Sequence, residues 1–134
     1  MMLSIMADLY SPLLALCGVY YLRFAMTKSF AIAFVAGYLY AYGFAFIELY
    51  FGWWQSMGAN FSSHTVAVAV IVFALLSVNF KVGCYAFVSM MAYGLVMTLL
   101  EYHSWFDILT TILVCLPCWL LFSVVNRRAS RSSL

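Results

Sequence analysis

Apolar residues fill five long runs of the chain, and short polar segments separate these runs. The runs cover about residues 3–22, 29–52, 65–79, 82–100 and 107–125. A helix of about 20 apolar residues crosses the roughly 30 Å hydrocarbon core of a bilayer. Four of the runs reach about that length, and the third is shorter. The pattern therefore predicts an all-α integral membrane protein, a polytopic bundle of five transmembrane helices.

The third and fourth runs need a separate argument, because together they form one apolar stretch from Val66 to Leu100. As a single helix this stretch would be too long for one span. Asn79 and Lys81 interrupt it and Gly83 follows, which favours two helices joined at that point. The alternative is a bundle of four spans, in which the short third run is re-entrant.

In the second run, large aromatic residues and small residues each recur at a regular spacing. Aromatic residues recur at every fourth position, at Phe30, Phe34, Tyr38, Tyr42, Phe46 and Tyr50. Small residues recur at the same interval, at Ala33, Gly37, Ala41 and Ala45. Residues four apart share a helix face, and small side chains let two helix backbones approach closely in lipid. We therefore expect this small-residue face to be a helix-packing surface, with Glu48 on the same side, directed at a partner helix.

Composition supports a membrane location. Hydrophobic residues make up 68% of the 134 residues and charged residues only 7%, with a mean hydropathy of +1.07. Soluble domains carry about 25% charged residues. The length allows one bundle over residues 1–134, ending in a short basic tail at residues 126–134. Because no basic residue precedes the first apolar run, we expect that run to be retained rather than cleaved as a signal peptide. No nucleic-acid partner is expected.

The charged residues predict an orientation. With five spans, all six basic residues fall on one side of the membrane: Arg23, Lys28, Lys81, Arg127, Arg128 and Arg131. All four acidic residues fall on the other side, and the four-span alternative loses this segregation. Basic residues are retained in the cytoplasm. We therefore expect the N-terminus outside, the C-terminus in the cytoplasm, and a location in the bacterial inner membrane.

The acidic residues are the candidates for ion or proton chemistry, and they are Asp8, Glu48, Glu101 and Asp107. Glu48 stands out because a carboxylate inside an apolar run is costly and often marks an ion or proton pathway. It lies only about one helical turn from the predicted outer boundary. Alternatively, the four acids form a negative rim that attracts cations to an outer vestibule, or they simply mark the outer side.

Cysteine and histidine give weaker signals. Cys115 and Cys118 form a C-x-x-C pair, but thiol redox chemistry needs an accessible thiolate of low pKa. This pair lies within an apolar run and no second pair exists to relay electrons, so we interpret both as packing residues and expect no enzymatic activity. His64 and His103 fall on the predicted outer loops without metal-ligand spacing. No metal or cofactor is therefore expected.

The general plan resembles that of phage holins: a short chain, a few spans, hardly any extramembrane mass and a basic cytoplasmic tail. The resemblance covers length and layout only, and it implies a self-associating protein that forms a pore. Two other hypotheses remain, a structural or accessory subunit of a larger membrane complex and a small proton- or ion-coupled transporter that uses Glu48. The expected partners are the lipid bilayer and either further copies of the chain or another membrane protein.

Overall fold

Five long helices and one short helix make up the chain in the computed structural model, which describes residues 1–134. They are α1 (Met2–Leu22), α2 (Lys28–Phe51), α3 (Trp53–Ser56), α4 (Ser63–Val78), α5 (Phe80–Leu99) and α6 (Trp105–Ser132), and there are no strands. Four of them, α1, α2, α5 and α6, are long and apolar enough to cross a membrane, whereas α4 is a shorter apolar helix. The expected all-α class is confirmed, and these helices are compatible with an integral membrane protein.

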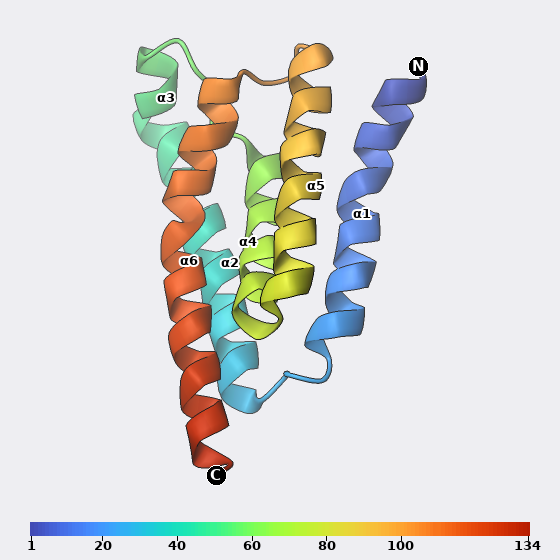
Figure 1. The fold of residues 1–134 in the computed structure, drawn as a ribbon. Coiled ribbons are helices and arrows are strands. Elements are labelled where there is room, and N and C mark those ends of the chain that lie inside the picture. The colour runs from blue at the N-terminus through green and yellow to red at the C-terminus, as the bar shows by residue number, and fades with distance from the viewer.

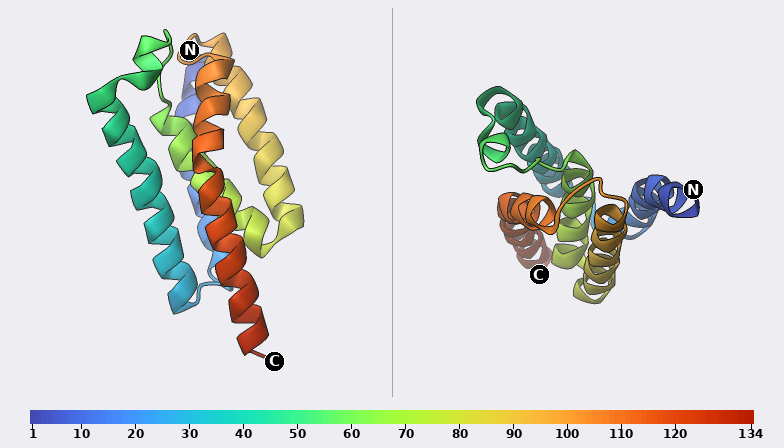
Figure 2. Two further views of the ribbon diagram at one scale, coloured as in Figure 1. Left: turned by 90° about the vertical axis from the view of Figure 1, so that its left-hand side faces the viewer. Right: turned by 90° about the horizontal axis from the view of Figure 1, so that it is seen from above.

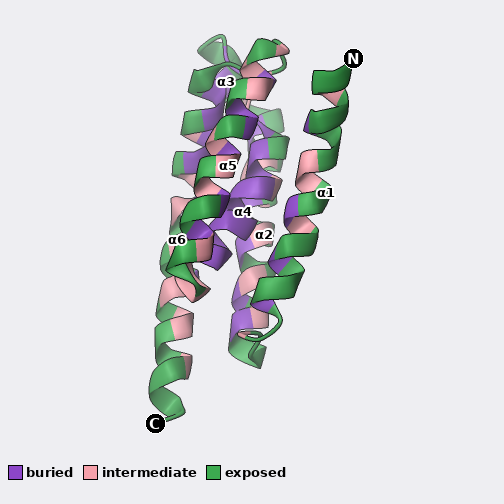
Figure 3. Cartoon of the chain, turned by 45° about the vertical axis from the view of Figure 1, so that its right-hand side comes forward, coloured by how far each residue is buried: buried purple, intermediate pink, exposed green.

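The shorter helix α4 stands at the centre of the bundle. It packs against α1, α2, α5 and α6, which surround it (Figures 1 and 2). Every residue from Val68 to Leu75 is buried, so α4 has no exposed face over that length (Figure 3). A helix that is apolar on all sides is suited to such a position. Its alanines and β-branched residues keep it slim, and the four longer helices can therefore approach it together.

The connections between helices gather at the two ends of the bundle. The N-terminus, α3 and the turn between α5 and α6 lie at one end (Figure 1). The loop between α1 and α2, the turn between α4 and α5, and the C-terminus lie toward the other (Figure 1). Asn79 makes the α4–α5 turn, because it ends α4 and its Oδ1 accepts a hydrogen bond from the Val82 backbone N at 3.3 Å.

Three local features refine the sequence expectations. Helix α1 continues through Pro12. Helix α6 likewise continues through Pro117 and includes most of the expected basic tail, where no residue breaks the helical hydrogen bonding before Ser132. The polar segment after α2 contains α3, a helix of only four residues that the hydrophobic pattern did not reveal.

Gly83 allows α4 and α5 to approach closely beside their shared turn. A Cβ atom at this position would collide with the backbone N and Cα of Leu76, which cannot rotate away. We expect Gly83→Ala to lower the free energy of unfolding by about 1–3 kcal/mol, although alanine has the higher helix propensity by about 1 kcal/mol. Thermal or SDS-induced unfolding of the detergent-solubilised protein measures this change.

Gly94→Ala is the matched control, because its added Cβ would lie 3.4 Å from the Trp105 ring and make an ordinary contact. The control should be neutral or stabilising. Equal effects of the two substitutions would contradict the close approach of α4 and α5 at Gly83.

Candidate functional site

The polar residues of the chain concentrate where α3 and the segment 57–62 lie against the first turns of α6. We call this group the polar cap, and it comprises Glu48, Trp54, Asn60, Ser62, Asp107, Thr110 and Thr111. Two glycines with left-handed backbone shape the chain here, Gly52 with φ of 64° between α2 and α3, and Gly58 with φ of 72° after α3. Glycine adopts this conformation without the steric cost that a Cβ imposes.

Glu48 joins the end of α2 to the start of α3. Its side chain is almost fully buried, with 6% of the residue exposed. Oε1 accepts a hydrogen bond from the Trp54 backbone N at 2.6 Å, and Oε2 accepts one from the Trp53 backbone N at 3.1 Å. A carboxylate is favourable at a helix N-terminus because the first N–H groups have no partner within the helix. Both carboxylate oxygens are thus engaged with backbone.

Asp107 accepts backbone hydrogen bonds at the start of α6, as Glu48 does at the start of α3. Its Oδ2 accepts a hydrogen bond from the Ser104 backbone N at 2.9 Å, and the Asp107 backbone N donates to Ser104 Oγ at 3.2 Å. This reciprocal pair is a capping box. The second oxygen, Oδ1, accepts from the Asn60 backbone N at 3.0 Å. Asp107 therefore ties the segment before α4 to α6 across 47 residues of sequence.

Hydroxyl groups complete the polar cap. Trp54 Nε1 donates to Thr110 Oγ1 at 2.8 Å, and the Ser62 backbone N donates to Thr111 Oγ1 at 3.2 Å. Thr111 Oγ1 in turn donates to the Asp107 backbone O at 2.7 Å. Buried backbone outside a helix needs such partners, especially when water is scarce. The side chains of α6 thus provide hydrogen bonds for the non-helical segment that enters the bundle.

The structure brings two of the four acidic residues into the polar cap and leaves the other two at the surface. Glu48 and Asp107 are buried; Glu48 accepts backbone hydrogen bonds from the start of α3, and Asp107 accepts one from Asn60 after α3. Asp8 and Glu101 are exposed, and Glu101 has a left-handed φ of 58° in the turn between α5 and α6. The buried pair therefore accepts backbone hydrogen bonds inside the polar cap, whereas the exposed pair lies outside it.

The two histidines lie beside the polar cap. Their ring centroids are 6.4 Å apart, and His103 Nδ1 lies 3.7 Å from Asp107 Oδ2. Burial lowers the pKa of His103 below its ordinary value, while the Asp107 carboxylate opposes that shift. No group of three or more histidine, cysteine, aspartate or glutamate side chains is placed to hold a metal ion.

The small-residue face of α2 lies against α6 of the same chain. Ala33, Gly37 and Ala41 are buried, and Ala45 is partly buried. A Cβ at Gly37 would come within 2.8 Å of the Phe122 ring. Cys118 Sγ donates to the Gly37 backbone O at 3.5 Å in the same interface.

The cysteines differ in their surroundings. Cys115 and Cys118 are buried on α6, whereas Cys17 and Cys84 are exposed on α1 and α5, and all four are free thiols. The C-x-x-C pair therefore lies inside the bundle, where neighbouring helices cover both sulfur atoms.

Two polar-cap residues were not singled out by the sequence pattern, Asn60 and Ser62. Local signals did exist. Ser62 caps α4 by accepting a hydrogen bond from the Thr65 backbone N at 3.2 Å, and serine before an apolar helix is a common N-cap. Paired threonines inside an apolar run also require partners. Which residues would supply those partners depends on helix packing.

No protein-family model, curated protein or solved structure matches the chain.

Replacing Glu48 tests the structural role of its carboxylate. In Glu48→Gln one amide NH2 would face a backbone N–H group, and a buried donor would lose its acceptor. We expect the free energy of unfolding to fall by about 1–3 kcal/mol. Thermal unfolding in detergent, followed by tryptophan fluorescence, measures the change because Trp53 and Trp54 adjoin the site.

Glu101→Gln provides the charge-matched control, because Glu101 is exposed and lies on the same end of the bundle. It should leave the unfolding transition almost unchanged. An equally stable Glu48→Gln protein would show that the two hydrogen bonds of Glu48 contribute little to the fold.

Proposed function

We propose that the chain crosses the bacterial inner membrane five times, with the N-terminus outside and the C-terminus in the cytoplasm. Helix α4 supports a fifth span because it runs through the bundle between α3 and the α4–α5 turn, which lie toward opposite ends (Figure 1). At 16 residues it is about 24 Å long. The polar cap covers its outer end and satisfies the backbone there. The positive-inside rule supplies the orientation.

Cysteine labelling tests this topology. In a background with Cys17→Ser and Cys84→Ser, Gln55→Cys on α3 should react with a membrane-impermeant thiol reagent in intact spheroplasts. Lys81→Cys and Ser133→Cys should react only in inverted vesicles, because both lie toward the cytoplasmic end. Labelling of Lys81→Cys from outside would instead favour four spans with α4 re-entrant.

We further propose that the protein functions by self-association within the bilayer. Its connections are short, at residues 23–27, 52–62 and 100–104, and α3 occupies part of the second. Within residues 1–134 these connections offer little surface outside the helices. On this proposal, a partner of these residues therefore meets them mainly through the outward-facing helix surfaces.

This proposal rests on one face of α2 that the rest of the chain leaves largely uncovered. Ser29, Ala36 and Gly43 recur every seven residues and are exposed or only partly buried. No atom lies within 4 Å of the position that a Gly43 Cβ would take. Glycine inside a helix costs about 1 kcal/mol relative to alanine, and no internal contact of this chain needs it there. Small residues at this spacing support close packing against a helix of another copy.

Pore formation is the most concrete version of this function, in agreement with the holin-like plan. The side chains of α4 fill the centre of a single copy, from Val68 to Leu75. A water-filled path would therefore run between copies rather than through one. On this proposal, the α2 face holds the copies together, and membrane permeability increases only after they assemble.

Bulky substitutions on the exposed α2 face test self-association. We expect Gly43→Leu and Ala36→Leu to convert the detergent-solubilised oligomer into a monomer, because leucine prevents close backbone approach. Light scattering coupled to size-exclusion chromatography measures the mass, and circular dichroism confirms that the helices persist. Ala92→Leu, at an exposed alanine of α5, is the matched control and should remain oligomeric.

The same variants test the pore. Induced expression of the unmodified protein should collapse the membrane potential, and Gly43→Leu should abolish that effect at equal expression. A monomeric unmodified protein would contradict self-association. Co-purification with a larger protein in mild detergent, together with instability when the chain is expressed alone, would favour the accessory-subunit hypothesis.

A further inference from the structure

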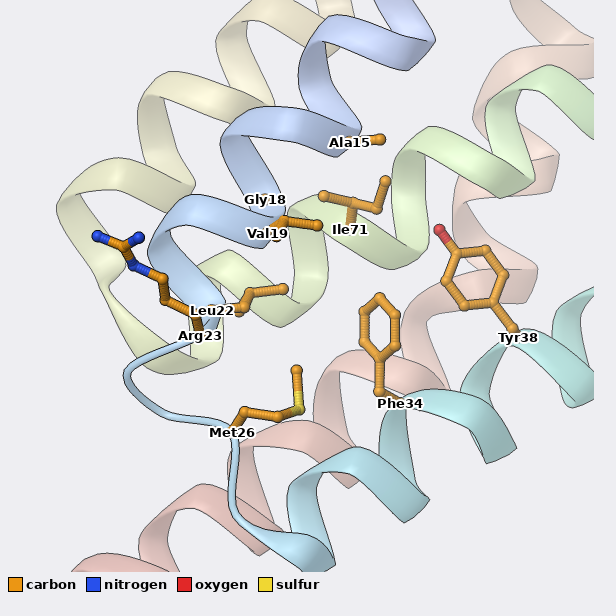
Figure 4. Close-up of a pocket in the computed structure, with 9 residues that line it drawn as sticks. All are labelled: Ala15, Gly18, Val19, Leu22, Arg23, Met26, Phe34, Tyr38 and Ile71. Atoms are coloured by element: carbon orange, nitrogen blue, oxygen red, sulfur yellow. The ribbon is translucent and has the colours of Figure 1, made fainter.

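Two regions between the helices differ in the side chains that meet there. An apolar groove of about 430 Å³ lies between α1 and α2, and the Arg23 side chain points away from it (Figure 4). Beside the polar cap, by contrast, His103 of the α5–α6 turn has His64 of α4 and Asp107 of α6 as neighbours. A side chain that changes its charge near neutral pH is therefore placed beside the carboxylate that holds segment 57–62.

The surroundings of His103 disfavour a positive charge on its ring. Nδ1 is buried without a hydrogen-bond partner, and it lies 3.7 Å from Asp107 Oδ2. Burial lowers the pKa of His103 below its ordinary value, and although the Asp107 carboxylate opposes this shift, His64 adds to it. Glu101 in the same turn is exposed, and Lys81, the one charged residue of α5, lies at the opposite end of that helix. The ring of His103 is therefore neutral in the intact fold near neutral pH.

The Asp107 carboxylate couples His103 to segment 57–62. Its Oδ1 accepts from the Asn60 backbone N at 3.0 Å, and its Oδ2 accepts from the Ser104 backbone N at 2.9 Å. Protonation gives both ring nitrogens of His103 an N–H group, so Nδ1 becomes a donor that faces Oδ2. An ion pair with His103 draws the carboxylate toward the α5–α6 turn and away from Asn60. Because Asn60 is exposed, water then replaces the carboxylate as the acceptor of its N–H group.

We propose that the polar cap is acid-sensitive, and that protonation of His103 releases Asn60 and segment 57–62 from α6. The fold lowers the pKa of His103, so the opened cap, in which the ring reaches water, binds the proton more tightly. The closed cap is thus favoured above the ordinary histidine pKa of about 6.5 and loses stability as the pH falls below it. When His64 is also charged, repulsion between rings whose centroids are 6.4 Å apart adds to the release. This acid response requires neither the proposed orientation nor self-association.

Hydrogen–deuterium exchange of the full-length protein in detergent tests the release. Exchange is followed at pH values of about 7.5 and about 5, on either side of the ordinary histidine pKa, and each rate is divided by the intrinsic rate at that pH. We expect the backbone amides of residues 57–62 to exchange severalfold faster at the lower pH, while those of residues 68–75 in α4 stay unchanged. His103→Gln cannot gain the charge and should abolish the difference. Glu101→Gln, which alters an exposed charge in the same turn, should retain it.

Tryptophan fluorescence gives a second measurement that needs no substitution. Trp54 Nε1 donates to Thr110 Oγ1 of α6, so the emission should change reversibly when the cap opens, with a midpoint below a pH of about 6.5. A midpoint near a pH of about 4 would assign the change to a carboxylate and overturn the proposal. Unchanged exchange of residues 57–62, or a full acid response in His103→Gln, would also overturn it. Equally accelerated exchange in residues 68–75 would show global unfolding in place of a local release, with the same consequence.

Discussion

The segment that leads from α3 into α4 depends on hydrogen bonds from other parts of the chain. Its backbone is not helical, yet it enters a bundle whose neighbouring surfaces are apolar. Unpaired N–H groups in such surroundings would cost several kcal/mol each. Glu48 and Asp107 accept hydrogen bonds from this segment and from the start of α3, and Thr110 and Thr111 extend the network. The start of α4, and with it the centre of the bundle, rests on these contacts.

This constraint changes how Glu48, the acidic residue inside an apolar run, is interpreted. An acidic residue in an apolar run ordinarily suggests ion or proton transfer. In this chain both oxygens of Glu48 accept backbone hydrogen bonds from the start of α3. The geometry therefore gives Glu48 an anchoring role that is sufficient to account for its position.

Packing inside the chain also determines which surfaces remain for partners. The face with Ala33, Gly37 and Ala41 is occupied by α6, so it is not available to a second copy while the fold is intact. On another side of the same helix Ala36 is exposed, and Gly43 is only partly buried with no atom within 4 Å of the position of an added Cβ.

The sequence by itself determined the helical class and the approximate helix positions. These properties are local, because hydropathy and residue spacing act over one or two helical turns. It also indicated that Gly37 and Ala41 face another helix, since their spacing of four places them together. The tertiary structure decided that this helix is α6, that α4 stands at the centre, and that Asp107 binds the backbone of Asn60. Those outcomes join residues far apart in the chain, and only the packing of all helices at once selects among the possible partners.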